Sequence, residues 1–443
     1  MSGSYSTIHE LRTSLASGAL RPSELAKAAL ARSNQNAGHN TYLWQDAAWT
    51  LAEAARAEGM PRSTGGPFDD GQPPLWGIPV AVKDCFDLAA TPTTCGTRFY
   101  RDLNGIATRD SWLVEQLRAA GAVIVGKTHL HALAYGITGE NPEFGDCMQP
   151  HDAGALTGGS SSGAVASVQE GSAVAAIGTD TGGSVRAPAA LGGLAGYRST
   201  LGRGDWRGGT HLAESFDTMG WLFRDLRDAP LLAAPFAPAQ IAPPQRFSRF
   251  TFVADSFLRD CEPEIVEAFH SMIRELEELG LAGQSIDIAW WADSIEIFAP
   301  LQASEAARLH AGNYERSDFL PQEPSITDRI KWGASFRPDE IAAFSRRHAD
   351  FRARMDDLLA AHELVLMPST PVARLAAGAD HSQTRSRLLR YTSPFSLAGV
   401  PAIAIPCAHG GMQLAAAREA DESLLQLGAQ LGAHRKAEGV REC

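Results

Sequence analysis

The sequence lacks the patterns that mark several common protein classes. Its six cysteines form no CxxC pair and show no spacing typical of a metal site or a disulfide framework. No stretch approaches the roughly 18 consecutive apolar residues that a membrane helix requires. The first residues lack the basic start and apolar run of a secretory signal. We therefore expect a reduced, cytoplasmic protein that binds no metal and contacts no membrane.

Positive charge is also scarce. The chain has 39 Lys and Arg against 51 Asp and Glu, so its formal net charge is −12. Because binding to phosphate backbones needs clustered Lys and Arg, we expect no direct contact with nucleic acid. With 44% apolar and 20% charged residues, the composition is typical of a globular protein with ample material for a core.

Helical and strand-like segments alternate along the chain. Residues 1–62 are expected to be mostly helical, and a strand-like run at 78–82 precedes a helix at 110–120 and a second strand at 122–125. This β-α-β rhythm favours a layered α/β core with crossover connections. The other expected elements are a Pro- and Ala-rich connector at 230–244, an amphipathic helix at 265–279, and strands at 250–254, 364–367 and 402–405.

A glycine- and serine-rich stretch at 158–186, GGSSSGAVASVQEGSAVAAIGTDTGGSVR, contains six serines but no histidine or cysteine. Such a stretch could hold a phosphate. However, a P-loop requires a lysine after its glycines, and none follows here. The dinucleotide pattern GxGxxG is absent as well. We therefore expect no cofactor.

Acyl transfer explains this stretch better. Gly182 and Gly183 precede Ser184, and paired glycines allow successive backbone N–H groups to point at one spot, as an oxyanion hole requires. Ser184 is then the candidate nucleophile, and it needs a base.

Two kinds of base are available. Lys83 closes an apolar strand, where desolvation would favour the neutral amine and make it a competent base. The alternative for this side chain is a lysine that extends to the surface and pairs with Asp84 or Asp87. A distant histidine could serve instead, and the candidates are His129, His131, His151 and His211.

Three motifs, read together, resemble the amidase signature family: GIPVAVKD at 77–84, GGSSSG at 158–163 and GTDTGGSVRAPAA at 178–190. The segments 126–145, 215–220, 366–371 and 396–407 extend the resemblance over most of the chain. It implies one large α/β domain with a central mixed sheet flanked by helices. Its expected parts are N-terminal helices at 1–62, a catalytic core at 75–225, a variable, mostly helical substrate-side region at 245–362, and strands and a helix at 363–443 that complete the sheet.

The resemblance also implies a Ser-Ser-Lys triad. Lys83 takes the position of the base, Ser160 that of a bridging serine held by a cis peptide, and Ser184 that of the nucleophile. Neutral Lys83 would accept a proton through Ser160 while Ser184 attacks an amide carbonyl. Water would then hydrolyse the acyl-enzyme.

Other residues receive supporting roles. The amides of Thr181, Gly182, Gly183 and Ser184 are the expected oxyanion donors. Ser161 is expected to support Lys83 or Ser160. Asp180 and Arg186 either pair beneath the loop or remain independent surface charges. Plausible substrate contacts are Tyr135, Trp206 and His211, together with the segment around Arg308, Tyr314, Arg329 and Trp332. The family's C-terminal Gly-Leu-Gln-Leu pattern survives only as the sequence GMQL at 411–414, so the pocket wall there is expected to differ.

The function implied is an amidohydrolase that cleaves a small-molecule carboxamide. The resemblance is also compatible with a homodimer. Alternatives within the class are a glutaminase-type subunit of a multi-chain amidotransferase and a biuret- or allophanate-type hydrolase. A non-catalytic scaffold that retains the fold is an alternative from another class.

Overall fold

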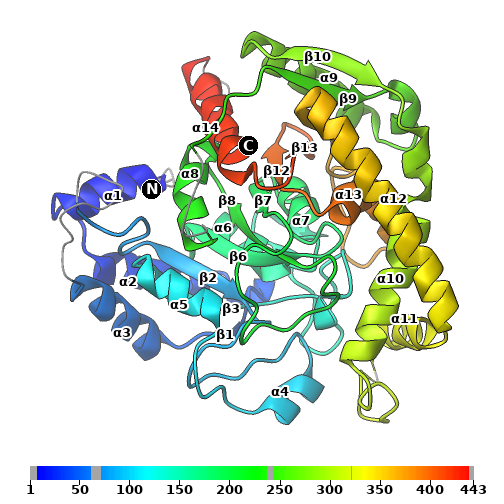
Figure 1. Cartoon of the computed structure of the whole chain (residues 1–443). Coiled ribbons are helices and arrows are strands. Elements are labelled where there is room, and N and C mark those ends of the chain that lie inside the picture. The colour runs from blue at the N-terminus through cyan, green and yellow to red at the C-terminus, as the bar shows by residue number, and fades with distance from the viewer. Residues whose placement is uncertain (1–6, 61–70, 237–242, 321, 439–443) are drawn as a thin grey trace.

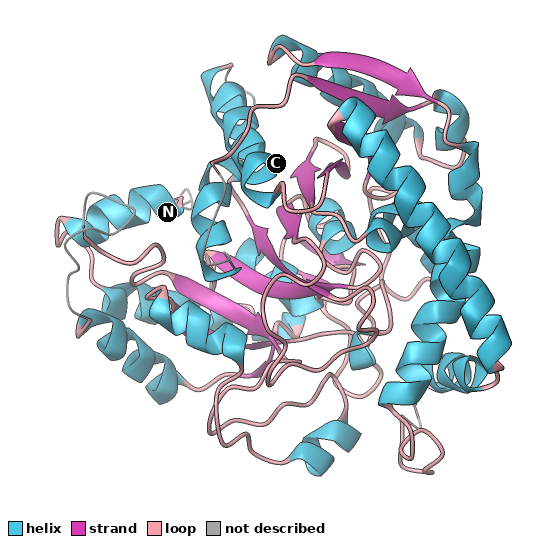
Figure 2. Cartoon of the chain, in the orientation of Figure 1, coloured by secondary structure: helices cyan, strands magenta, loops and turns pink. Residues whose placement is uncertain are grey.

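An eleven-stranded mixed sheet crosses the described part of the chain (Figures 1 and 2). The computed structural model describes residues 7–60, 71–236, 243–320 and 322–438. In spatial order the strands are β1 (Tyr42–Trp44), β3 (Val123–Thr128), β2 (Pro79–Lys83), β6 (Ala175–Asp180), β8 (Thr218–Phe223), β7 (Ala195–Arg198), β12 (Ala402–Pro406), β13 (Gly411–Ala416), β11 (Leu364–Pro368), β9 (Arg249–Val253) and β10 (Ala282–Ile286).

The centre of the sheet positions the motifs. β2 runs parallel to both β3 and β6, so their carboxyl ends lie at the same edge. β6 in turn pairs antiparallel with β8. All residues of β2, β3, β6 and β8 are buried, which explains their largely apolar sequences.

Helices cover the sheet (Figure 1). α2 and α3 contact β3 at one end, α6 packs on β2 and β6, and α14 packs on β12. Helix α10 packs against α11, α12 and α13 on the right of the view. The helices are α1 (Ile8–Ala16), α2 (Pro22–Gln35), α3 (Ala47–Glu58), α4 (Arg98–Asn104), α5 (Trp112–Ala119), α6 (Ser162–Glu170), α7 (Arg186–Leu191), α8 (Ala229–Ala233), α9 (Pro263–Glu278), α10 (Ser294–Leu309), α11 (Pro324–Ala334), α12 (Pro338–His362), α13 (Thr384–Ala398) and α14 (Asp421–Ala437). A separate hairpin pairs β4 (Met148–Gln149) with β5 (Asp152–Leu156).

The predicted fold class, a central mixed sheet flanked by helices in one domain, is confirmed. The expected connector at 230–244 is wrong in its first part, because α8 occupies Ala229–Ala233; residues 237–242 lie outside the described ranges. Pro230 is tolerated there because the amide it lacks has no partner in the first turn of a helix. The buried side chains of α8 pack against α14, a contact between distant segments that local composition could not show.

Within the described ranges, no helix combines the length and apolarity needed to cross a membrane.

Candidate active site

Lys83 ends β2 and is completely buried. Its Nζ lies 2.8 Å from Ser160 Oγ, 3.1 Å from Ser161 Oγ and 2.8 Å from Thr179 Oγ1. Burial lowers the pKa of Lys83 to about 8. A neutral amine is therefore accessible near physiological pH, and three hydroxyls hold it in place.

The alternative in which Lys83 pairs with Asp84 or Asp87 is wrong. Asp84 instead forms a buried ion pair with Lys127, with Nζ and Oδ1 2.6 Å apart. Asp87 accepts a hydrogen bond from Thr93 Oγ1 at 2.7 Å. Lys127 therefore balances the charge of Asp84, and Lys83 contacts hydroxyl groups instead of a carboxylate.

If Lys83 is the base, activity should follow its titration. We expect kcat/KM for an amide to rise about tenfold per pH unit below pH 8 and to level off above it, because only the neutral amine accepts a proton. Initial rates of ammonia release from pH 6 to 10 measure this, with enzyme preincubated at each pH as the control for inactivation. A profile that is flat or falling between pH 6 and 8 would contradict the role of Lys83.

The serines of GGSSSG lie where β5 leads into α6. The Gly159–Ser160 peptide bond is cis. Ser161 also exchanges hydrogen bonds with the backbone of Thr179: the Thr179 amide donates to Ser161 Oγ, and Ser161 Oγ donates to the Thr179 carbonyl, each at 3.3 Å. Ser161 therefore links the lysine to β6, a position that suits a supporting residue.

Ser184 lies in the turn between β6 and α7 and is 5% exposed. The Ser161 amide donates to the Ser184 carbonyl at 3.3 Å, so the two serine-bearing segments are in direct contact. Gly183 adopts φ +115°, and a Cβ there would lie 2.5 Å from Thr392 Cβ, so only glycine fits this turn. In the described part of the chain, the Ser184 hydroxyl makes no hydrogen bond. Hydrogen bonds from a nucleophile to its base often form only with substrate present.

The backbone amides of the turn are not equivalent. The Gly183 amide donates to Asp180 Oδ1 at 2.8 Å, which argues against Gly183 as an oxyanion donor. Among the described contacts, the amides of Thr181, Gly182 and Ser184 have no protein acceptor. These three groups remain candidates for stabilising an oxyanion.

Asp180 and Arg186 form a buried ion pair beneath the turn, with Nη2 and Oδ1 2.9 Å apart, and are not independent surface charges. Arg198, which the sequence did not single out, also reaches Asp180 Oδ1 at 2.9 Å. Burial alone would raise the pKa of Asp180, but the two guanidinium groups outweigh it and hold the pKa well below its usual range. Arg186 Nη1 also donates a hydrogen bond to Gln413 Oε1 at 2.8 Å, so the GMQL motif stabilises this ion-pair network.

Trp206 and His211 lie together near the turn. Their rings stack with centroids 4.2 Å apart, and His211 Nδ1 lies 2.9 Å from Asp217 Oδ2. Asp217 accepts a hydrogen bond from Thr181 Oγ1 at 2.6 Å. Asp217 thus connects His211 to Thr181, which lies in the turn that carries Ser184.

The four histidines make no described hydrogen bond to Ser184. Burial lowers the pKa of His129 to about 4 and that of His131 to about 3.

The other predicted substrate contacts are spread over several elements. Tyr135 lies four residues after His131, and its carbonyl accepts a hydrogen bond from Arg329 Nη2 at 2.7 Å. Arg308 forms an exposed ion pair with Glu214, and Trp332 is 44% exposed.

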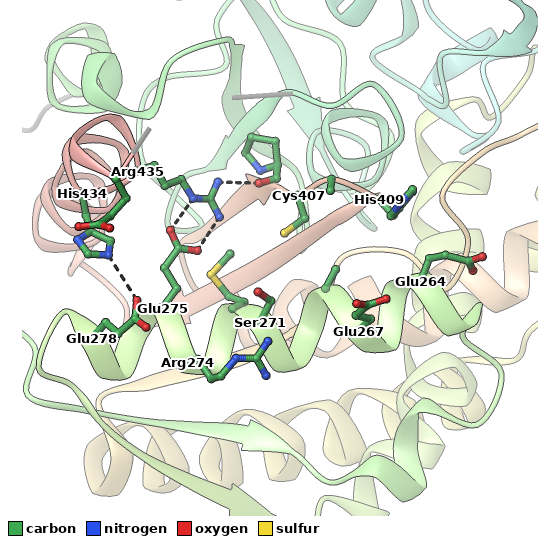
Figure 3. A pocket seen from close by; sticks show the side chains of 15 residues that line it. Glu264, Glu267, Ser271, Arg274, Glu275, Glu278, Cys407, His409, His434 and Arg435 are labelled. Atoms are coloured by element: carbon green, nitrogen blue, oxygen red, sulfur yellow. Dashed lines mark hydrogen bonds and ion pairs between the residues drawn. The ribbon is translucent and has the colours of Figure 1, made fainter. Parts of the chain in front are cut away.

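A surface cavity of about 550 Å³ lies between α9, the turn after β12, and α14 (Figure 3). None of the predicted site residues lines it. Its Arg435 is paired with Glu275 at 2.6 and 2.9 Å, and its His434 with Glu278 at 3.6 Å. Across the described ranges, no group of three His, Cys, Asp or Glu side chains could hold a metal ion.

Comparisons with known proteins identify the family of the chain. The model of the Amidase family matches residues 24–425. A glutamyl-tRNA(Gln) amidotransferase subunit from Roseiflexus castenholzii is 30% identical, covering 95% of this chain and 94% of its own. An indoleacetamide hydrolase from Pseudomonas savastanoi is 29% identical, covering 90% and 89%. A crystal structure of an amidase superimposes with a TM-score of 0.85 at 28% identity, covering 97% and 100%. The chain therefore belongs to the Amidase family, whose members are enzymes that act on carbon–nitrogen bonds.

Proposed function

We propose that this chain is an amidohydrolase that cleaves the C–N bond of a small linear carboxamide through an acyl-enzyme on Ser184. The observation that carries the proposal is Lys83 Nζ, which is buried with a lowered pKa and lies 2.8 Å from Ser160 Oγ. A lysine in that state is a base, and Ser160 lies beside the segment that contacts Ser184.

The proposed reaction moves one proton along the triad in each direction. Ser184 Oγ attacks the carbonyl carbon while its proton passes to Ser160 and the proton of Ser160 passes to Lys83. The amides of Thr181, Gly182 and Ser184 stabilise the oxyanion. As the C–N bond breaks, the proton returns through Ser160 to the leaving amine. A water molecule then attacks the ester by the same relay and releases the carboxylic acid.

An amidotransferase component is the second candidate, and the Roseiflexus relative supports it. Such a component would depend on partner chains for turnover. A non-catalytic scaffold is the weakest alternative, because Lys83 and Ser160 are in contact and the segment that follows Ser160 contacts the backbone of Ser184. A reducing, cytoplasmic setting is also proposed, since the five described cysteines are free thiols.

Ammonia release by the purified chain tests the proposal. The substrates are a panel of aliphatic, aromatic, ureido and amino-acid amides, with Ser184→Ala as the blank. Turnover of at least one simple amide by the chain alone is expected. If turnover appears only after partner chains are added, the amidotransferase candidate replaces the hydrolase.

A further inference from the structure

One peptide unit of the turn that carries Ser184 is held at both ends. The N–H group of the peptide between Gly182 and Gly183 donates to Asp180 Oδ1 at 2.8 Å. Its carbonyl oxygen, which belongs to Gly182, accepts a hydrogen bond from Thr392 Oγ1 at 2.5 Å. In the described part of the chain, this hydroxyl is the one donor to that carbonyl. Because the N–H and C=O groups of a trans peptide point in opposite directions, the two contacts fix the orientation of the peptide plane.

Two glycines make this peptide easy to rotate when it is not held. Neither residue has a Cβ, so both can adopt backbone conformations that other residues rarely reach, and Gly183 has φ +115°. The amides on either side of the peptide, those of Gly182 and Ser184, have no protein acceptor in the described ranges and are candidate oxyanion donors. The torsion angles of the two glycines set the direction of one amide relative to the other. Both amides can therefore point at one spot only while the peptide between them is fixed.

Thr392 reaches the turn from α13 and is completely buried. Its side chain lies directly against Gly183, since a Cβ on that glycine would lie 2.5 Å from Thr392 Cβ and 2.6 Å from Thr392 Cγ2. The hydroxyl also lies 3.2 Å from the Leu388 carbonyl, one turn earlier in α13. A hydroxyl has one proton to donate, and the shorter distance makes the Gly182 carbonyl its main acceptor. The Thr392 carbonyl accepts a hydrogen bond from Arg186 Nη1 at 3.0 Å, which connects Thr392 to the buried ion-pair network beneath the turn.

We propose that Thr392 is a positioning residue, which holds the Gly182–Gly183 peptide so that the amides of Gly182 and Ser184 stay directed at the oxyanion. The inference rests on the proposed acyl-enzyme function. Thr392 acts through the backbone, because its described hydrogen bonds include none to the side chains of Lys83 or Ser184. Preorganised donors stabilise charge that develops in the transition state, so a misdirected donor costs rate and not substrate affinity.

Thr392→Val tests the proposal, because valine keeps the branched shape and removes the hydroxyl. We expect kcat for amide hydrolysis to fall about 10- to 100-fold while KM changes by less than about threefold. Complete loss of one oxyanion donor costs about 10²–10³-fold in kcat, and a misdirected donor costs less. Thr392→Ala also lacks the hydroxyl but takes less space, and it should show the same loss. Thr392→Ser keeps the hydroxyl and should recover most of kcat. Initial rates over a range of substrate concentrations measure both constants.

Thr251→Val is the matched control. Thr251 is also completely buried, and its hydroxyl donates to a backbone carbonyl, that of Gln284, at 2.8 Å. This hydrogen bond joins β9 to β10, at the opposite end of the sheet from β2 and β3. The same exchange should therefore leave kcat and KM within about twofold of wild type. Thermal unfolding of each variant checks that it is folded.

Labelling of Ser184 by a fluorophosphonate separates the role of Thr392 from the hydrolase function. Phosphonylation also develops negative charge on an oxygen at the oxyanion site, but it needs no amide turnover. We expect Thr392→Val to slow labelling about tenfold or more, and Thr392→Ser and Thr251→Val to stay within about threefold of wild type.

A labelling rate in Thr392→Val equal to that of wild type would overturn the role of Thr392. A loss of activity confined to KM, or one shared equally by Thr251→Val, would do the same. Absence of turnover with every amide would instead remove the proposed function, and the labelling rates would still decide the role of Thr392. A wild-type chain that shows neither turnover nor labelling would remove both proposals.

Discussion

Replacing Ser184 with alanine is expected to lower amide hydrolysis by about 10⁴-fold or more. In the proposed reaction this hydroxyl supplies the atom that forms the acyl-enzyme. The turn itself should persist, because its glycines, the Asp180 hydrogen bond to the Gly183 amide and the contact of the Ser184 carbonyl with the Ser161 amide do not involve the hydroxyl. Ammonia release in the steady state, and covalent labelling by a serine-directed probe with mass spectrometry, measure the effect.

Ser167→Ala is the matched control for this substitution. Ser167 is also buried and lies in the same serine-rich stretch, but its hydroxyl donates to the Ala164 carbonyl inside α6 at 2.9 Å. Activity should therefore stay within about threefold of wild type, because the exchange removes one hydrogen bond inside α6 and changes no contact of Lys83, Ser160 or Ser184. Labelling of Ser160 in place of Ser184, or near-normal turnover by Ser184→Ala, would reassign the nucleophile.

Much of the candidate site was predictable because its parts are short motifs. Lys83 closes an apolar strand, and the run GGSSSG and the pair Gly182-Gly183 are readable locally. The buried contact between Lys83 and Ser160 joins residues 77 positions apart, and only the resemblance to a family suggested it. Parallel pairing of β2 with β6 brings Lys83 and Thr179 to one edge of the sheet, and the hydrogen bonds of Ser161 with the backbone of Thr179 hold the neighbouring Ser160 beside Lys83.

The rest depended on packing between distant elements. Arg198 and Gln413 reach the Asp180 network from β7 and β13, two strands absent from the sequence-based prediction. The contact of Arg329 with Tyr135 joins α11 to a segment 194 residues earlier in the chain, and no local sequence pattern predicts it. The partner of the Gly183 amide could not be predicted either. The glycine pattern predicts a turn, but it does not show that Asp180 accepts a hydrogen bond from this amide.

The Asp180 network should be a main determinant of stability. Asp180→Asn is expected to lower the free energy of unfolding by about 3–5 kcal/mol, because it leaves the buried guanidinium groups of Arg186 and Arg198 without their counter-charge. Three backbone amides also donate to this carboxylate, those of Gly183, Val185 and Arg186, at 2.8, 3.2 and 3.3 Å. The asparagine NH₂ group would face some of these donors. Urea unfolding followed by circular dichroism measures the loss.

Asp152→Asn is the control, since the same exchange there breaks an ion pair with Arg374 that is about half exposed. Its cost should stay below about 1 kcal/mol. The folded-state pKa of Asp180 lies below the ordinary value of 3.8, so its contribution is complete above that pH and is lost as the pH falls below it. The difference in stability between wild type and Asp180→Asn should therefore be constant from pH 6 to 8 and narrow only in strong acid. Equal costs for the two exchanges would mean that the buried network does not stabilise the turn that carries Ser184.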